Sequence, residues 1–152
     1  MARTFESVDP APALAETDIR SLSARLMDGR LRMFERFRAL FALRALGTPA
    51  AIDAMALALL DDKSALLRHE VAFTFGQLRD PHSVKYLVRS IEHDESAMVR
   101  HEACEALGAI ATAECVPVLE RTMIEDPAIE VRESCQVALD NIHYLKDRAT
   151  LD

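Results

Sequence analysis

The sequence Leu67-Arg68-His69-Glu70 recurs 32 residues further on as Val99-Arg100-His101-Glu102, and the surrounding residues recur with it. The same spacing relates these pairs: Ser64 and Ser96, Gly76 and Gly108, Leu78 and Ile110, Asp94 and Asp126. A fixed period of this length is typical of stacked supersecondary units, none of which buries its apolar face alone. The repeat therefore predicts a solenoid, and the recurring His-Glu pairs point to a metal site.

The composition favours helices over strands. Half of the 152 residues are apolar, yet aromatic residues make up only 5% and Trp is absent. Gly (4) and Pro (6) are also scarce. These proportions favour an all-α protein with closely packed helices, in one domain with a sizeable core.

The charge and the cysteine pattern bound the class of partner and the compartment. A formal net charge of −7 argues against nucleic acid as the main ligand and fits a basic partner. No apolar run reaches the roughly 18 residues of a membrane span, so we expect no membrane association. The three Cys lack CxxC spacing, which indicates reduced thiols in a cytoplasmic protein.

Helix start and stop signals divide the chain into segments. We expect a flexible leader over residues 1–16, a helical-repeat domain over 17–147 and a tail over 148–152. Thr17 is the expected N-cap of a short first helix that ends near Gly29. The expected repeat helices cover residues 32–46, 49–60, 65–79, 81–92, 97–111, 114–124 and 128–145.

Counted from residue 32, these helices form about four pairs of period 32, of which the last lacks its second helix. Phe75, Leu107 and Leu139 occupy equivalent core positions in successive units. The fold class is therefore all-α, an α-α superhelix whose inner helices line one surface. The incomplete last unit predicts an uncovered apolar end and self-association at high concentration.

Both histidines of the repeated motif are expected to lie outside the core. Each helical residue advances by about 100°, so His69 lies about 200° from Leu67 and almost opposite the apolar stripe that contains Val71. His101 has the same relation to Val99.

The two motifs are expected to converge on one metal ion. Adjacent packed helices lie about 8–10 Å apart, so His69 and the His101-Glu102 pair can reach a shared point. Two imidazoles and one carboxylate form the facial set that favours Fe(II). Glu70 is the fourth candidate, as a ligand or as a partner of one. Two alternatives stay open, a hydrolytic zinc site and a metal-free scaffold that binds protein partners.

Several other residues are expected to have structural roles. Gly76 and Gly108 either keep the surface shallow for a ligand or allow close helix packing. Cys104 is expected to be a small buried or groove-lining residue, and the alternative is a thiolate that binds metal. Arg68 and Arg100 are expected to pair with acidic residues between repeats. Three histidines are expected to be solvent-exposed without carboxylate partners: His82, His93 and His143.

The repeated motifs, continuing as His69-Glu70-Val71-Ala72-Phe73 and His101-Glu102-Ala103-Cys104-Glu105, resemble the deoxyhypusine hydroxylase family. The stretches 36–44 and 126–131 are also similar to that family, so the resemblance covers roughly residues 32–145. It implies a HEAT-repeat enzyme with a non-haem di-iron centre. Such an enzyme hydroxylates the deoxyhypusine side chain of a translation initiation factor and completes hypusine. The resemblance also implies that His69, His101 and Glu102 bind one iron, with Glu70 beside them.

The sequence departs from the family in one large way. The family chain has two halves, each with two His-Glu motifs, and its two irons lie between the halves. Here two motifs are present, and Glu133-Ser134 stands at the equivalent place in the fourth unit. The resemblance therefore implies that a second half or a second copy must supply the remaining motifs, and that the isolated half is inactive without it.

Overall fold

The computed structural model describes residues 8–150, and that part of the chain contains helices and no strands. The α-helices are α1 (Ile19–Met27), α2 (Met33–Leu46), α3 (Pro49–Asp61), α4 (Ala65–Leu78), α5 (Val84–His93), α6 (Ala97–Ile110), α7 (Val116–Glu125) and α8 (Ile129–Ala149). Short 3-10 turns precede α5 and α7. The predicted all-α class is confirmed.

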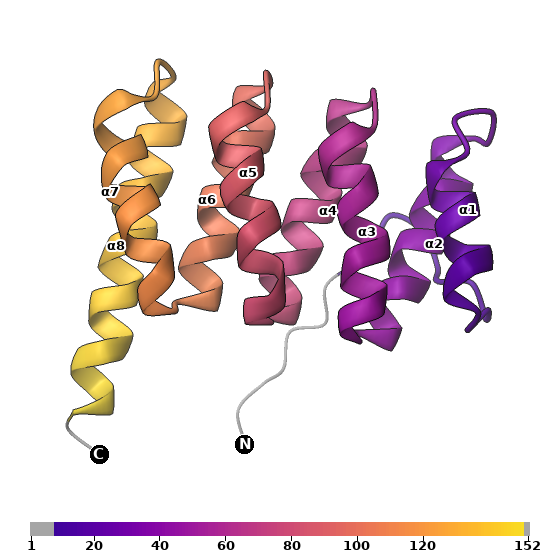
Figure 1. Ribbon diagram of the computed structural model, residues 1–152, viewed down its shortest axis with the longest axis horizontal. Helices are drawn as coiled ribbons and strands as arrows, with labels where there is room; N and C mark the ends of the chain where they lie inside the picture. Colours follow the sequence, from indigo (N-terminus) through magenta and orange to yellow (C-terminus); the bar gives the residue numbers. More distant parts are fainter. Residues whose placement is uncertain (1–7, 151–152) are drawn as a thin grey trace.

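The helices form two layers that lie one behind the other in Figure 1. Helices α2, α4, α6 and α8 form the inner layer, and the contacts of α6 with α4 and α8 are the most extensive in the molecule. Helices α1, α3, α5 and α7 form the outer layer. The inner layer holds both His-Glu motifs, as the sequence predicted.

The grouping into pairs differs from the expected one. Among the outer helices, α6 makes its most extensive contacts with α5, and α8 makes its most extensive contacts with α7. The pairs are therefore α1–α2, α3–α4, α5–α6 and α7–α8 (Figure 1). The expectation that the last unit lacks a second helix was wrong, because a period fixes the spacing of units and not where each begins. Helix α8 is the second member of its pair.

Three ion pairs join successive repeats. Arg36 pairs with Asp62, Arg68 Nε lies 2.7 Å from Asp94 Oδ2, and Arg100 Nε lies 2.8 Å from Asp126 Oδ2. The expected inter-repeat pairing of Arg68 and Arg100 is confirmed. Each aspartate also accepts a backbone N–H just before the next inner helix, so one carboxylate fixes both the packing and the start of that helix.

Glycine allows the inner helices to approach closely. A Cβ on Gly108 would lie 2.7 Å from Ala138 Cβ, and one on Gly76 would lie 3.2 Å from Ala106 Cα. Of the two readings that the sequence left open, close helix packing therefore explains both positions.

Three of the inner helices end in the same backbone conformation. Gly47, Arg79 and Ala111 are C-caps with φ of 60°, 52° and 59°, in the left-handed region. Only glycine adopts this conformation without a steric cost. Arg79 and Ala111 therefore carry a steric cost at these positions.

Residues 8–16, the described part of the expected leader, have no helix and lie against α2. The Leu14 N–H donates to the Arg38 carbonyl at 3.2 Å, and Ala11 is buried. Residues 1–7 of that leader and 151–152 of the expected tail lie outside the described residues. The N-cap of α1 is Asp18 rather than Thr17, because the Asp18 carboxylate accepts the Ser21 N–H.

Candidate metal centre

His69 and Glu102 meet across the boundary between α4 and α6. His69 Nε2 lies 3.1 Å from Glu102 Oε2, and the Glu102 side chain is 9% exposed. The hydrogen bond to Glu102 raises the pKa of His69, although burial of the ring opposes this shift. The structure therefore brings His69 to Glu102, as predicted, whereas the group of ligand atoms that includes His101 does not include His69.

His101 lies on the same face of α6 as Glu102 and Glu105. One ligand atom from each of these three residues lies within 4.8 Å of the others. His101 Nε2 is 3.8 Å from Glu105 Oε1, beyond hydrogen-bond distance, and the Glu105 side chain is half exposed. The Glu102 carboxylate is thus the common point between His69 and His101.

The other ring nitrogen of His101 contacts α8. His101 Nδ1 lies 2.5 Å from Ser134 Oγ, and the Ser134 hydroxyl lies 2.7 Å from the Glu130 carbonyl oxygen. Ser134 is 6% exposed. The His101 ring is therefore held from the side opposite Glu105.

Glu70 flanks this group, and its carboxylate accepts no hydrogen bond from the described residues. Burial raises its pKa, and the charge of Glu102 adds to that shift, whereas His69 and Arg44 oppose it. Glu70 thus lies within electrostatic reach of His69 and Glu102, at a half-buried position.

The residues present fit a divalent metal ion. Two ligand atoms at about 2.1 Å from one ion and at right angles to each other are about 3.0 Å apart. The 3.1 Å between His69 Nε2 and Glu102 Oε2 is close to that value, although the same distance also suits a shared proton. Imidazole nitrogen and carboxylate oxygen are ligands that both Fe(II) and Zn(II) accept.

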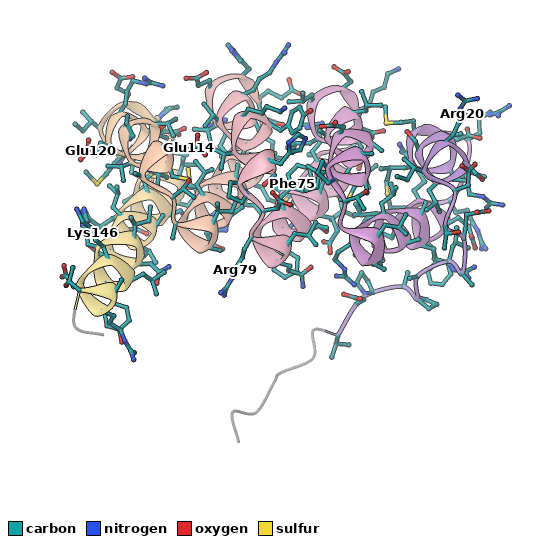
Figure 2. All side chains as sticks on the ribbon, turned by 60° about the horizontal axis from the view of Figure 1, so that its bottom comes forward. Arg20, Phe75, Arg79, Glu114, Glu120 and Lys146 are labelled. Carbon is teal, nitrogen blue, oxygen red and sulfur yellow. The ribbon has the colours of Figure 1, made fainter. Side chains whose placement is uncertain are left out.

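A groove borders the group along the inner layer. It has a volume of about 570 Å³ and is lined by Phe73, Gly76, Glu102, Glu105 and Ala109, among others. Arg79 stands at its rim and extends away from the helices in Figure 2. The arrangement therefore combines candidate metal ligands with a space that an elongated ligand could enter.

Two members of this site were missed by the sequence analysis. Glu105 lies four residues after His101, and this spacing places both on one helix face, which is a signal that could have found it. Ser134 was noted only as a departure from the His-Glu motif. Its contact with His101 depends on how α6 and α8 pack.

The remaining histidines and cysteines lie outside the group. His93 and His143 are exposed, as expected. The expectation for His82 was wrong, because its Nε2 lies 2.7 Å from Asp53 Oδ1, which α3 supplies from the neighbouring repeat. Cys104 is buried, as predicted, with its Sγ 3.3 Å from Cys135 Sγ.

The family model for HEAT repeats matches residues 54–140, more than half of the 152 residues. The chain belongs to the HEAT-repeat family. The model of the PBS lyase HEAT-like repeat also matches residues 35–61. The HEAT repeats thus include α2, the motifs on α4 and α6, and the Ser134 region of α8.

Curated relatives of this HEAT-repeat chain are named deoxyhypusine hydroxylase, the family that the motifs resemble. It is 48% identical to deoxyhypusine hydroxylase of Lentinula edodes over 87 residues, which cover 49% of this chain and 26% of the relative. It is 47% identical to deoxyhypusine hydroxylase of Gallus gallus over 76 residues, covering 50% of this chain and 25% of the relative. The resemblance to this family is confirmed.

A solved structure shows the same fold. Human deoxyhypusine hydroxylase in complex with glycerol is 44% identical and has a TM-score of 0.86. The match covers 95% of this chain and 50% of the human chain. The HEAT-repeat chain described here thus spans about half the length of that protein, and its matched segments span about a quarter of the curated relatives.

None of the helices between residues 8 and 150 combines the length and the apolar character that crossing a bilayer requires.

Proposed function

We propose that this chain carries half of the active site of a deoxyhypusine monooxygenase. Such an enzyme uses O2 to hydroxylate the deoxyhypusine side chain of a translation initiation factor in the cytoplasm, which completes hypusine. The observation that carries the proposal is the 3.1 Å contact between His69 on α4 and Glu102 on α6, because Glu102 also lies within 4.8 Å of a ring nitrogen of His101. The relatives named deoxyhypusine hydroxylase support it and do not favour a metal-free scaffold.

In this proposal His69, His101 and Glu102 hold one Fe(II), with Glu70 beside them. When bound, iron supplies the activation of O2 that C–H hydroxylation needs. The protein residues position the metal ligands and provide the negative charge that attracts a cation. Glu102 lies between the two histidines, and burial of its carboxylate among helices strengthens its attraction for a cation. A non-haem di-iron centre then requires four His-Glu motifs.

The second pair of motifs would come from the other half of the enzyme or from a second copy of this chain. Large apolar side chains are exposed near the site: Leu66 and Met98 each lie three residues before a motif histidine, on the same helix face. Such residues favour a protein partner on the inner layer. Sedimentation at increasing concentration, with and without Fe(II), tests the second copy, and a monomer under all conditions would contradict it.

The activity is tested with the purified chain, Fe(II), O2, a chemical reductant and a deoxyhypusine-bearing translation factor, because one oxygen atom enters the side chain while two electrons and two protons convert the other to water. Mass spectrometry of the factor should show the gain of one oxygen atom on that side chain. Zinc in place of iron should give no product, which separates the proposal from the hydrolytic zinc site. No gain of oxygen at a chain concentration that forms dimers would contradict the proposed activity.

A further inference from the structure

We propose that Ser134 is a positioning residue that fixes the tautomer of His101, so that His101 Nε2 presents its lone pair to the metal site. The inference rests on the proposed function. It concerns the fourth unit, in which Glu133-Ser134 stands where the two preceding units have His-Glu.

The register of the repeats brings Ser134 to His101. His69 meets Glu102, 33 residues later, on the next inner helix, and His101 meets Ser134 across the same 33-residue interval. Each motif histidine therefore contacts the last motif position of the following repeat. A glutamate there offers a charged metal ligand, whereas a serine offers only a neutral hydroxyl.

The Ser134 hydroxyl contacts the Glu130 carbonyl oxygen and His101 Nδ1, and only one orientation of its hydrogen is compatible with both contacts. The hydroxyl oxygen lies 2.7 Å from the Glu130 carbonyl oxygen, and two oxygens at this distance need a proton between them. Ser134 has a single hydroxyl hydrogen, so that hydrogen is donated to Glu130. The 2.5 Å contact with His101 then requires His101 Nδ1 to be the donor.

A neutral imidazole with its hydrogen on Nδ1 has its lone pair on Nε2. His101 Nε2 is the ring nitrogen on the side of Glu105, at 3.8 Å from its carboxylate. Histidine ligands of metals usually donate their other N–H to a protein acceptor, which fixes the tautomer and the ring orientation. Ser134 is that acceptor, and its burial holds the geometry.

The experiment compares wild type with Ser134→Ala and Ser134→Thr. Ser83→Ala is the matched control, because Ser83 is a buried serine on the outer side that also donates to a backbone carbonyl, at 2.7 Å from Asp80 O. Calorimetric titration with Fe(II) under anaerobic conditions should show binding about 10–100-fold weaker in Ser134→Ala. Ser134→Thr, which keeps the hydroxyl, and Ser83→Ala should match wild type.

The second measurement is the tautomer of His101 in the metal-free protein. Nitrogen NMR of the imidazole rings reports it at a pH above the range in which histidine titrates. Wild type should show the hydrogen on Nδ1, and Ser134→Ala should lose this preference. A mere packing role would weaken folding without changing the tautomer, so weaker iron binding with an unchanged tautomer would overturn the inference. Wild-type iron affinity in Ser134→Ala would also overturn it.

The two proposals fail separately. If wild type binds no iron, the proposed function fails, and the metal-free tautomer still decides the role of Ser134. A wild-type His101 with its hydrogen on Nε2 would overturn the role of Ser134 even where iron binds.

Discussion

His69 on α4 and Glu102 on α6 join adjacent repeats through a 3.1 Å contact between Nε2 and Oε2. The next repeat has the same relation between His101 and Ser134, at 2.5 Å. The site is therefore a product of the repeat register, since residues 33 positions apart meet wherever two inner helices pack.

Loss of one partner from an inter-repeat ion pair should strongly destabilise the stack. In Asp94→Ala the buried guanidinium of Arg68 loses its carboxylate, which is 2.7 Å away in the structure. Removal of one partner of a buried pair typically costs about 3–5 kcal/mol. Urea unfolding should show a loss of this size. Glu92→Ala is the control, because its pair with Arg121 is exposed and such pairs contribute about 0–1 kcal/mol. Equal losses would contradict the assignment.

Gly108→Ala should destabilise the protein. The added Cβ would lie 2.8 Å from Ala138 Cα, a backbone atom that cannot rotate away. Overpacking typically costs about 1–3 kcal/mol, and it should outweigh the roughly 0.5–1 kcal/mol gained from replacing glycine in a helix. Gly76→Ala meets its neighbour at 3.2 Å and should be nearly neutral. Thermal unfolding of both variants tests this order, which a more stable Gly108→Ala would reverse.

Ala111→Gly should stabilise the protein by about 0.5–1 kcal/mol, because Ala111 has φ of 59° and glycine adopts this conformation without a Cβ clash. The equivalent C-cap, Gly47, already has this residue. Ala109→Gly, within the last turn of the same helix, should destabilise by a similar amount. Chemical unfolding of the pair provides the comparison, and a destabilised Ala111→Gly would refute the strain at that position.

The pairing of Asp126 should appear in the pH dependence of stability. Burial raises the pKa of Asp126, but hydrogen bonds from Arg100 and the Ala128 N–H outweigh this effect and hold the pKa of the carboxyl group below its usual range. A carboxyl group with a lowered pKa in the folded state contributes stability above its unfolded pKa, and this contribution is lost as the pH falls through the folded pKa. The difference in unfolding free energy between wild type and Asp126→Asn should therefore be constant at neutral pH and shrink below about pH 4. A difference that grows on acidification would contradict this.

The period of the sequence predicted the parts of the fold that repeat. It identified the inner helices, the arginine pairing and the convergence of His69 with Glu102, because these follow from spacing alone. It did not identify the pairing of helices, Glu105 or the role of Ser134. These depend on which faces pack and on side-chain positions within the packed layer, as does the contact of His82 with Asp53 from another repeat.

The ligand set of the proposed site is tested most directly by anaerobic Fe(II) binding to wild type, His101→Ala and His93→Ala. His101 lies within 4.8 Å of Glu102 and Glu105, whereas His93 is exposed at the end of α5. We expect His101→Ala to lose iron affinity by well over the roughly 10–100-fold typical of residues that only support a ligand, and Glu70→Ala to lie nearer that range. His93→Ala should bind like wild type, and circular dichroism should show unchanged helix content in all variants. Equal iron binding by His101→Ala and His93→Ala would contradict the proposed metal site.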